Sequence, residues 1–279
     1  MARIGNFQLV VQTRDEDNAG STNLIRLFSG FTEVANFKKT PPARGKAKMY
    51  FANVDLDYDQ FLSNAISLAM TSNDAWAPRS AFLFGLVISN GAMIMPLAQN
   101  FFLHPNSWVS QDVSKGLDRW PMQSLARATP SDPLDTLIFC MMTADMANAE
   151  SPGPFELSLF GNVGGQPVLV YQTVLATVGT QNPAERDGTY LTMLPIWSQL
   201  NFTADKLAGV QIVNRSDDSW LPADILLFAA NKQLTKARLL SRWPIDGSHL
   251  VSQDPHDSET KTFRAHQAVA FPIRLDNLV

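Results

Sequence analysis

Short apolar or alternating stretches follow one another along the chain, and polar or glycine-containing turns separate them. Stretches rich in strand-forming residues cover residues 7–13, 23–29, 46–56, 65–71, 134–143, 154–161, 167–178, 208–214 and 223–230. None of them sustains the 3.6-residue period of a helix, and turn signals recur about every 8–12 residues, which is typical of antiparallel β-sandwiches. The pattern therefore predicts an all-β chain.

Residues 80–111 carry no formal charge, and this stretch is apolar enough to suggest a membrane-spanning helix. Asn90-Gly91 interrupts this stretch, and Pro96 follows. Because Asn-Gly between two apolar runs is a strong signal for a tight hairpin turn, we expect two buried strands joined by a turn instead.

Three sequence blocks recur in the same order in the two halves of the chain. They pair residues 13–21 with 143–151, residues 72–84 with 216–228, and residues 109–112 with 251–254. The middle pair shares a Trp two residues before a Pro, at Trp76 and Trp220. Such self-similarity indicates duplication of one domain. It predicts two antiparallel β-sandwich domains of similar topology, at residues 1–129 and 134–279, joined by a linker at 130–133.

Two motifs connect these repeats with a known family. Residues 13–30, TRDEDNAGSTNLIRLFSG, follow the pattern T-x-D-x-x-x-A-G-[ST] and lead into a strand that ends at a glycine, and the later loops NDAWAP and DDSWLP share Asp-x-Trp-x-Pro. This order resembles the PLAT family, the β-sandwich domain of lipoxygenases and lipases. The resemblance implies a tandem PLAT-like pair that attaches to lipid through loops. Glu150 replaces the loop glycine in the second repeat, and the lysine-rich residues 38–48 lie outside the pattern.

The composition restricts the kind of protein. Hydrophobic residues make up 45% of the chain and charged residues 17%, which suits a packed core and excludes general disorder. With a net charge of -4, the chain lacks the basic excess of a general nucleic-acid binder, so we expect no nucleic-acid partner. The N-terminal residues contain no secretory signal, which predicts a cytoplasmic protein, or one exported without a classical signal peptide.

Groups for catalysis are scarce, so we expect no catalytic residue and no enzymatic activity. The four histidines lie outside the metalloprotease and nucleophile motifs, at His104, His249, His256 and His266. Cys140, the single cysteine, lies in an apolar stretch, where a cysteine usually behaves as a small buried hydrophobe. A hydrolase with an unrecognised pair of carboxylates is the remaining enzymatic alternative.

A calcium site is conceivable where two acidic loops meet at one end of each sandwich. Calcium binds six to eight hard oxygens, often from adjacent loops. The candidate ligands are Asp15, Asp17 and Asp74 in the first repeat and Asp145, Asp217 and Asp218 in the second. Asp and Asn also cap turns through their own backbone, which is the alternative interpretation. Asp55, Asp57 and Asp59 would share one face of an extended stretch, either as a second cation site or as a solvated face.

A basic run and two tryptophans are the candidates for contact with lipid or a partner. The run consists of Lys38, Lys39, Arg44, Lys46 and Lys48, contains two prolines and no acid, and is interpreted as a mobile loop. It can dock an anionic headgroup, or it is simply solvated. Trp76 and Trp220 either insert at a bilayer interface or plug the core at one sandwich end, and the repetition favours the plug.

Taken together, these patterns favour a non-enzymatic tandem β-sandwich module. It would attach to a membrane or lipid surface, or to a protein partner, through loops at one end, with calcium as a possible cofactor. The alternative from another class is a structural or self-assembling protein in which the two like domains supply repeated interfaces, so that the chain would be an oligomer.

Overall fold

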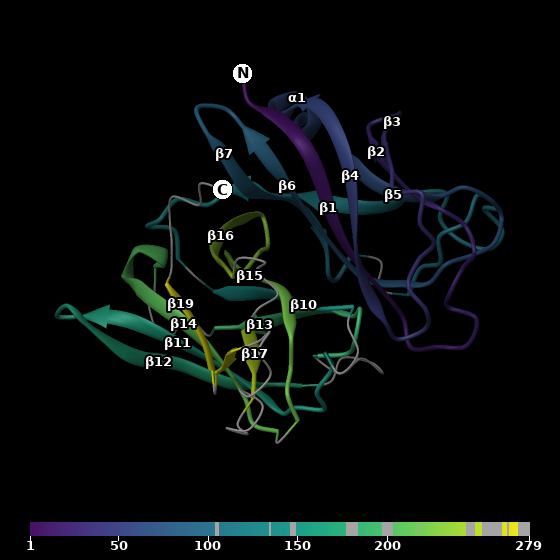
Figure 1. Ribbon diagram of the computed structural model, residues 1–279. Coiled ribbons are helices and arrows are strands. Elements are labelled where there is room, and N and C mark those ends of the chain that lie inside the picture. The colour runs from purple at the N-terminus through teal and green to yellow at the C-terminus, as the bar shows by residue number, and fades with distance from the viewer. Residues whose placement is uncertain are drawn as a thin grey trace. The chain divides into compact units, whose positions relative to one another are not determined.

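A computed structural model of the chain describes residues 1–103, 106–133, 135–145, 149–176, 184–196, 203–216, 218–243, 249–252, 264–266 and 268–272. The chain divides into two compact units. The first is built mainly from Met1–Arg127 with Gln233–Ala237, and the second from Ala128–Lys232 and Arg238–Asp276. The prediction of an all-β chain is confirmed: among the described residues, both units consist mainly of antiparallel sheets, with one short helical segment in each (Figure 1).

The first unit is one curled sheet. Its elements are β1 (Arg3–Thr13), β2 (Ile25–Ser29), β3 (Thr32–Asn36), β4 (Ala47–Asp57), α1 (Tyr58–Ser63), β5 (Ile66–Met70), β6 (Pro78–Ile88), β7 (Ala92–Asn100), β8 (Trp120–Ser124) and β9 (Ala126–Arg127). Eight of the strands form a sheet in the order β3-β2-β5-β8-β7-β6-β1-β4. Leu27 of β2 and Leu9 of β1 belong to the same buried cluster, although their strands are far apart in this order. The sheet therefore wraps around a single core.

The predicted hairpin over residues 80–97 is confirmed as β6 and β7. Their register runs from Ala81 opposite Asn100 to Ile88 opposite Ala92, and the N–H of Ser89 closes the turn on the carbonyl of Gly91 at 3.0 Å. Both strands are largely buried because they lie in the middle of the curled sheet. Across the described residues, no helix has the length and apolar character needed to cross a membrane.

The second unit contains two four-stranded arrays around its own core. Its elements are β10 (Thr136–Thr143), β11 (Phe155–Val163), β12 (Gln166–Leu175), β13 (Thr189–Pro195), η2 (Ala204–Lys206), β14 (Leu207–Asn214), β15 (Pro222–Ala230), β16 (Lys236–Trp243), β17 (His249–Val251), β18 (Arg264–His266) and β19 (Ala268–Pro272). One array has the order β13-β10-β15-β16 and the other β12-β11-β14-β19. Buried side chains of both arrays form one cluster, as in a sandwich.

The two units share one strand order. The array β4-β1-β6-β7 of the first unit corresponds to β13-β10-β15-β16 of the second, and β3-β2-β5-β8 corresponds to β12-β11-β14-β19. The pairs differ in strand length: β3 spans five residues, whereas β12 spans ten.

The stretch around Asp55, Asp57 and Asp59 departs from the extended conformation considered above. β4 ends at Asp57, whose carboxylate accepts a hydrogen bond from the N–H of Gln60 at 2.8 Å and caps α1. Asp59 lies in the first turn of that helix. The three carboxylates therefore do not share one strand face, and the second cation site suggested for them is wrong.

Candidate functional site

Trp76 and Trp220 occupy equivalent, completely buried positions. The indole N–H of Trp76 donates to the hydroxyl of Thr13, and that of Trp220 donates to the hydroxyl of Thr143, each at 3.0 Å. Both side chains have 0% exposure. The prediction that they contact lipid or a partner is therefore wrong, because neither ring reaches the surface. The alternative interpretation as core plugs agrees with this burial.

The backbone around each Trp follows the same pattern in both units. Trp76 exchanges a pair of backbone hydrogen bonds with Val109, and Trp220 does so with Val251. The next residue in each unit donates to the carbonyl of an alanine, from Ala77 to Ala19 at 2.9 Å and from Leu221 to Ala149 at 3.0 Å. These partners are the residues that the repeated sequence blocks align with one another.

The acidic side chains proposed as calcium ligands in the first unit bind other protein groups. The guanidinium of Arg44 contacts Asp15 at 2.8 Å and also Asp17, and its hydrogen bond to Asp15 is the main cause that raises the pKa of Arg44. Asp74 accepts hydrogen bonds from the N–H of Thr22 at 3.1 Å and the hydroxyl of Ser21 at 2.9 Å. These bonds, the one from Thr22 first, lower the pKa of Asp74.

Among the acidic candidates of the second unit, Asp145 pairs with an arginine as its counterpart in the first unit does. Asp145 pairs with Arg186 at 3.1 Å, as Asp15 pairs with Arg44. The backbone carbonyl of Asp218 accepts hydrogen bonds from Asn214 at 2.7 Å and Ser151 at 3.1 Å. Asp217 lies outside the described residues.

The described candidates therefore do not gather into a calcium site, and the second site, which includes Asp217, is not fully described. Over the described ranges, no three His, Cys, Asp or Glu side chains come together as metal ligands. Arg44 lies between the carboxylates of Asp15 and Asp17, and Asp74 serves as a turn acceptor. The turn-capping alternative describes Asp74 correctly.

Hydrogen bonds join the backbone of the basic run to neighbouring strands. The N–H of Ile25 donates to the carbonyl of Lys39 at 3.0 Å, the hydroxyl of Tyr50 donates to the carbonyl of Thr40 at 2.7 Å, and the hydroxyl of Thr13 donates to the carbonyl of Pro42 at 2.7 Å. Strands on both sides therefore hold the backbone of this run at these positions.

A pocket of about 440 Å³ lies beneath this loop, and we call it the basic pocket. Its lining residues are Phe37, Lys39, Thr40, Pro41, Pro42, Ala43, Lys48, Met49, Tyr50 and Phe51. The structure thus brings Lys39 and Lys48 together at one cavity. Lys38 is exposed and Lys46 is half-buried, and neither belongs to the lining.

The basic pocket combines cationic, aromatic and neutral polar groups. Lys39 is exposed and Lys48 is half-buried, while the ring of Phe51 next to them is 57% exposed. Tyr50 is buried, and desolvation raises the pKa of its hydroxyl, so the hydroxyl stays protonated as the donor to Thr40. A cavity with two ammonium groups, a neutral wall and an exposed ring suits an anionic group attached to an apolar body.

The lysines of this pocket were identifiable from the sequence, but its aromatic wall was not. Phe37, Tyr50 and Phe51 flank the basic run in sequence. For Tyr50 and Phe51, the alternation along β4 is the signal that one side chain is buried and the other exposed. Tyr50 is buried and Phe51 is exposed because successive strand residues face opposite sides.

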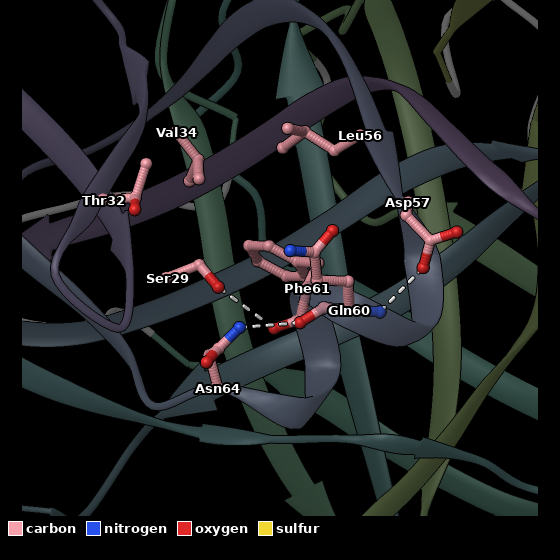
Figure 2. A pocket seen from close by; sticks show the side chains of 8 residues that line it. All are labelled: Ser29, Thr32, Val34, Leu56, Asp57, Gln60, Phe61 and Asn64. Atoms are coloured by element: carbon pink, nitrogen blue, oxygen red, sulfur yellow. Dashed lines mark hydrogen bonds between the residues drawn. The ribbon is translucent and has the colours of Figure 1, made fainter.

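A second, smaller pocket of about 130 Å³ lies beside α1. Figure 2 shows it between β3, the end of β4 and the helix, with Phe61 in its wall and Asp57 hydrogen-bonded to the N–H of Gln60. The hydroxyl of Ser29 and the amide of Asn64 donate to carbonyls of the helix, at 3.3 and 2.8 Å. Its polar groups thus hold α1 in place, and it contains less space for a ligand than the basic pocket.

Comparisons with known proteins reveal little kinship. No protein-family model matches the chain, and no curated protein sequence does. Among solved structures, the alpha toxin from Clostridium absonum matches with a TM-score of 0.38 and 12% sequence identity over 53% of this chain. The match covers 33% of the toxin chain. A likeness this distant carries no argument about function, and membership of the PLAT family stays a prediction.

Proposed function

We propose that the chain is a non-enzymatic tandem β-sandwich module whose first unit docks onto an anionic membrane surface through the basic pocket. The observation that carries this proposal is the gathering of Lys39 and Lys48 at one cavity of about 440 Å³ beside the exposed ring of Phe51. The equal strand orders of the two units support an origin by duplication. All residues that line the basic pocket belong to the first unit.

The chemistry of the pocket matches a lipid headgroup at an interface. Ammonium groups attract headgroup phosphates, and each cation near an anionic bilayer contributes about 1 kcal/mol. The ring of Phe51 is 57% exposed and can enter the interfacial region, where aromatic rings are favoured. Because the chain as a whole has a net charge of -4, this attraction depends on the local cations rather than on the overall charge.

The first prediction concerns the two lysines of the pocket. Vesicles containing an anionic lipid should co-sediment with the chain, and uncharged vesicles should not. Replacing both residues, Lys39→Gln with Lys48→Gln, removes two cations and should weaken binding to anionic vesicles by about 2 kcal/mol, or roughly 30-fold. Higher salt should weaken binding of the unaltered chain, because screening acts within about 10 Å at 0.1 M ionic strength.

Two matched variants serve as controls. Arg44→Gln removes a cation from the same loop, but Arg44 does not line the pocket, so the loss of binding should be smaller than in the double lysine variant. Lys206→Gln with Lys232→Gln removes two exposed cations of the second unit and should leave binding unchanged. If the control and pocket variants lose vesicle binding equally, binding depends on the total charge of the chain and not on the pocket. An absence of binding to every vesicle tested would reject the proposal.

A further inference from the structure

The outer strand of the second unit, β12, offers an open hydrogen-bond ladder. It stands at the end of the order β12-β11-β14-β19 and, among the described strands, pairs with β11 alone. Figure 1 shows it as the outer strand of a long hairpin. A strand that is paired on one side directs alternate N–H and C=O groups to its other side. Along Gln166–Leu175 every second residue presents these groups, and Pro167 has no N–H to donate.

The side chains along this strand are unusually apolar for an exposed position. Val168, Leu169 and Val174 are 44%, 49% and 56% exposed. Val163, at the end of the neighbouring strand β11, is 57% exposed. Four large apolar residues exposed on one hairpin mark a candidate site of interaction, whereas single exposed apolar residues are ordinary.

The strand also lacks the charges that usually protect a sheet edge. Residues 157–184 contain no acidic or basic side chain. The outer strand β4 of the first unit, by contrast, carries Lys48, Asp55 and Asp57. Proteins discourage edge-to-edge pairing by such charges, by short edge strands or by proline. In β12 Pro167, near its start, and a β-bulge where the register shifts between Leu169 and Tyr171 act in this way, so Tyr171–Leu175 is the regular part of the strand that is open to pairing.

We propose that β12 pairs in antiparallel orientation with β12 of a second copy of this chain. The open ladder requires an extended strand as its occupant, and the uncharged apolar surroundings favour a strand that is itself apolar and uncharged. β12 meets both requirements. Two identical strands paired antiparallel around a twofold axis use the same surface on both copies, so the assembly closes as a dimer.

The size of this surface predicts a weak dimer. The strand supplies ten residues per copy, whereas a stable interface of standard size involves about 20–30 residues on each side. We therefore expect monomers in dilute solution and dimers at high concentration. Neither lysine of the basic pocket takes part, so this inference does not depend on the proposed membrane function.

Sedimentation equilibrium of the full chain without lipid, from about 1 µM to about 1 mM, tests the pairing. The apparent mass should rise from one chain toward two, and hydrogen exchange of the backbone amides in β12 should slow over the same range. Leu169→Lys with Val174→Lys should keep the chain monomeric throughout, because lysines on an edge strand oppose pairing. Val113→Lys, at a residue that is 76% exposed in the first unit, should dimerise like the unaltered chain.

Gln172→Lys, at an exposed polar position of the same strand, keeps the test decisive where the double variant fails to fold. A chain that stays monomeric at the highest concentration would overturn the proposal. So would a dimer that persists in the lysine variants, or one that forms while the amides of β12 exchange as before. Protection of β12 that appears only with uncharged vesicles would identify a bilayer as the occupant instead, and would also overturn it.

Discussion

Replacing Trp220 by Ala should lower the free energy of unfolding of the second unit by about 3–5 kcal/mol. The indole has 0% exposure, lies edge-on to the ring of Phe155 with centroids 5.0 Å apart, and donates to the hydroxyl of Thr143. Its removal leaves a large cavity and an unpaired hydroxyl. Urea unfolding followed by circular dichroism measures the loss.

Trp76→Ala provides the matched variant in the first unit and should cost a similar amount, because Trp76 has the same burial and the same kind of Thr partner. Thr143→Val keeps the volume but removes the acceptor of the Trp220 indole, and should cost about 1–3 kcal/mol. A loss below about 1 kcal/mol in both alanine variants would contradict the role of these rings as core plugs.

Replacing Arg242 by Met should destabilise the second unit by about 3 kcal/mol at neutral pH. The guanidinium of Arg242 binds both oxygens of the Asp224 carboxylate, at 3.1 and 2.9 Å, and Asp224 is only 2% exposed. Without Arg242 the carboxylate is buried without a cation. Urea unfolding at two pH values measures both the loss and its pH dependence.

The direction of that pH dependence follows from burial. Desolvation raises the pKa of Asp224 above its ordinary value of 3.8, although hydrogen bonding to Arg242 opposes this. In the variant the opposing contact is gone, so the native pKa rises further. The unfolded chain then binds fewer protons than the native chain between the two pKa values, and stability falls as pH rises. The variant should regain stability from pH 7 to about pH 5, whereas a pH-independent loss would contradict this account.

Long apolar strands bounded by clear turn signals were predictable from the sequence, whereas short elements were not. The hairpin of β6 and β7 could be located because Asn90-Gly91 separates two long apolar runs. α1 was missed because six residues are too few to display helical periodicity. Its signal was the cap, since Asp57 precedes Gln60 by three residues, a spacing typical of helix starts. β3 is five residues long and largely exposed, so its pairing with β2 defines it more than its own pattern does.

The candidate site was predictable in position but not in its pairings. Lys39 and Lys48 were identified by charge alone, and the structure places both at the basic pocket. Arg44 belongs to the same run, but its charge is taken up by Asp15, which is 29 residues away in sequence. A contact at that separation depends on how β1 and β4 pair, and local patterns do not report it. Arg44, predicted to contact a headgroup, therefore pairs with Asp15 and Asp17, which were predicted to bind calcium.

The paired indoles have a practical consequence for measuring stability. Each unit contains one tryptophan N–H that is fully buried and bonded to a threonine, in nearly identical settings. Such protons exchange with solvent only when the surrounding structure opens. Their two exchange rates, measured by nuclear magnetic resonance, would thus report the opening of each half separately, and unequal rates would reveal halves that open independently.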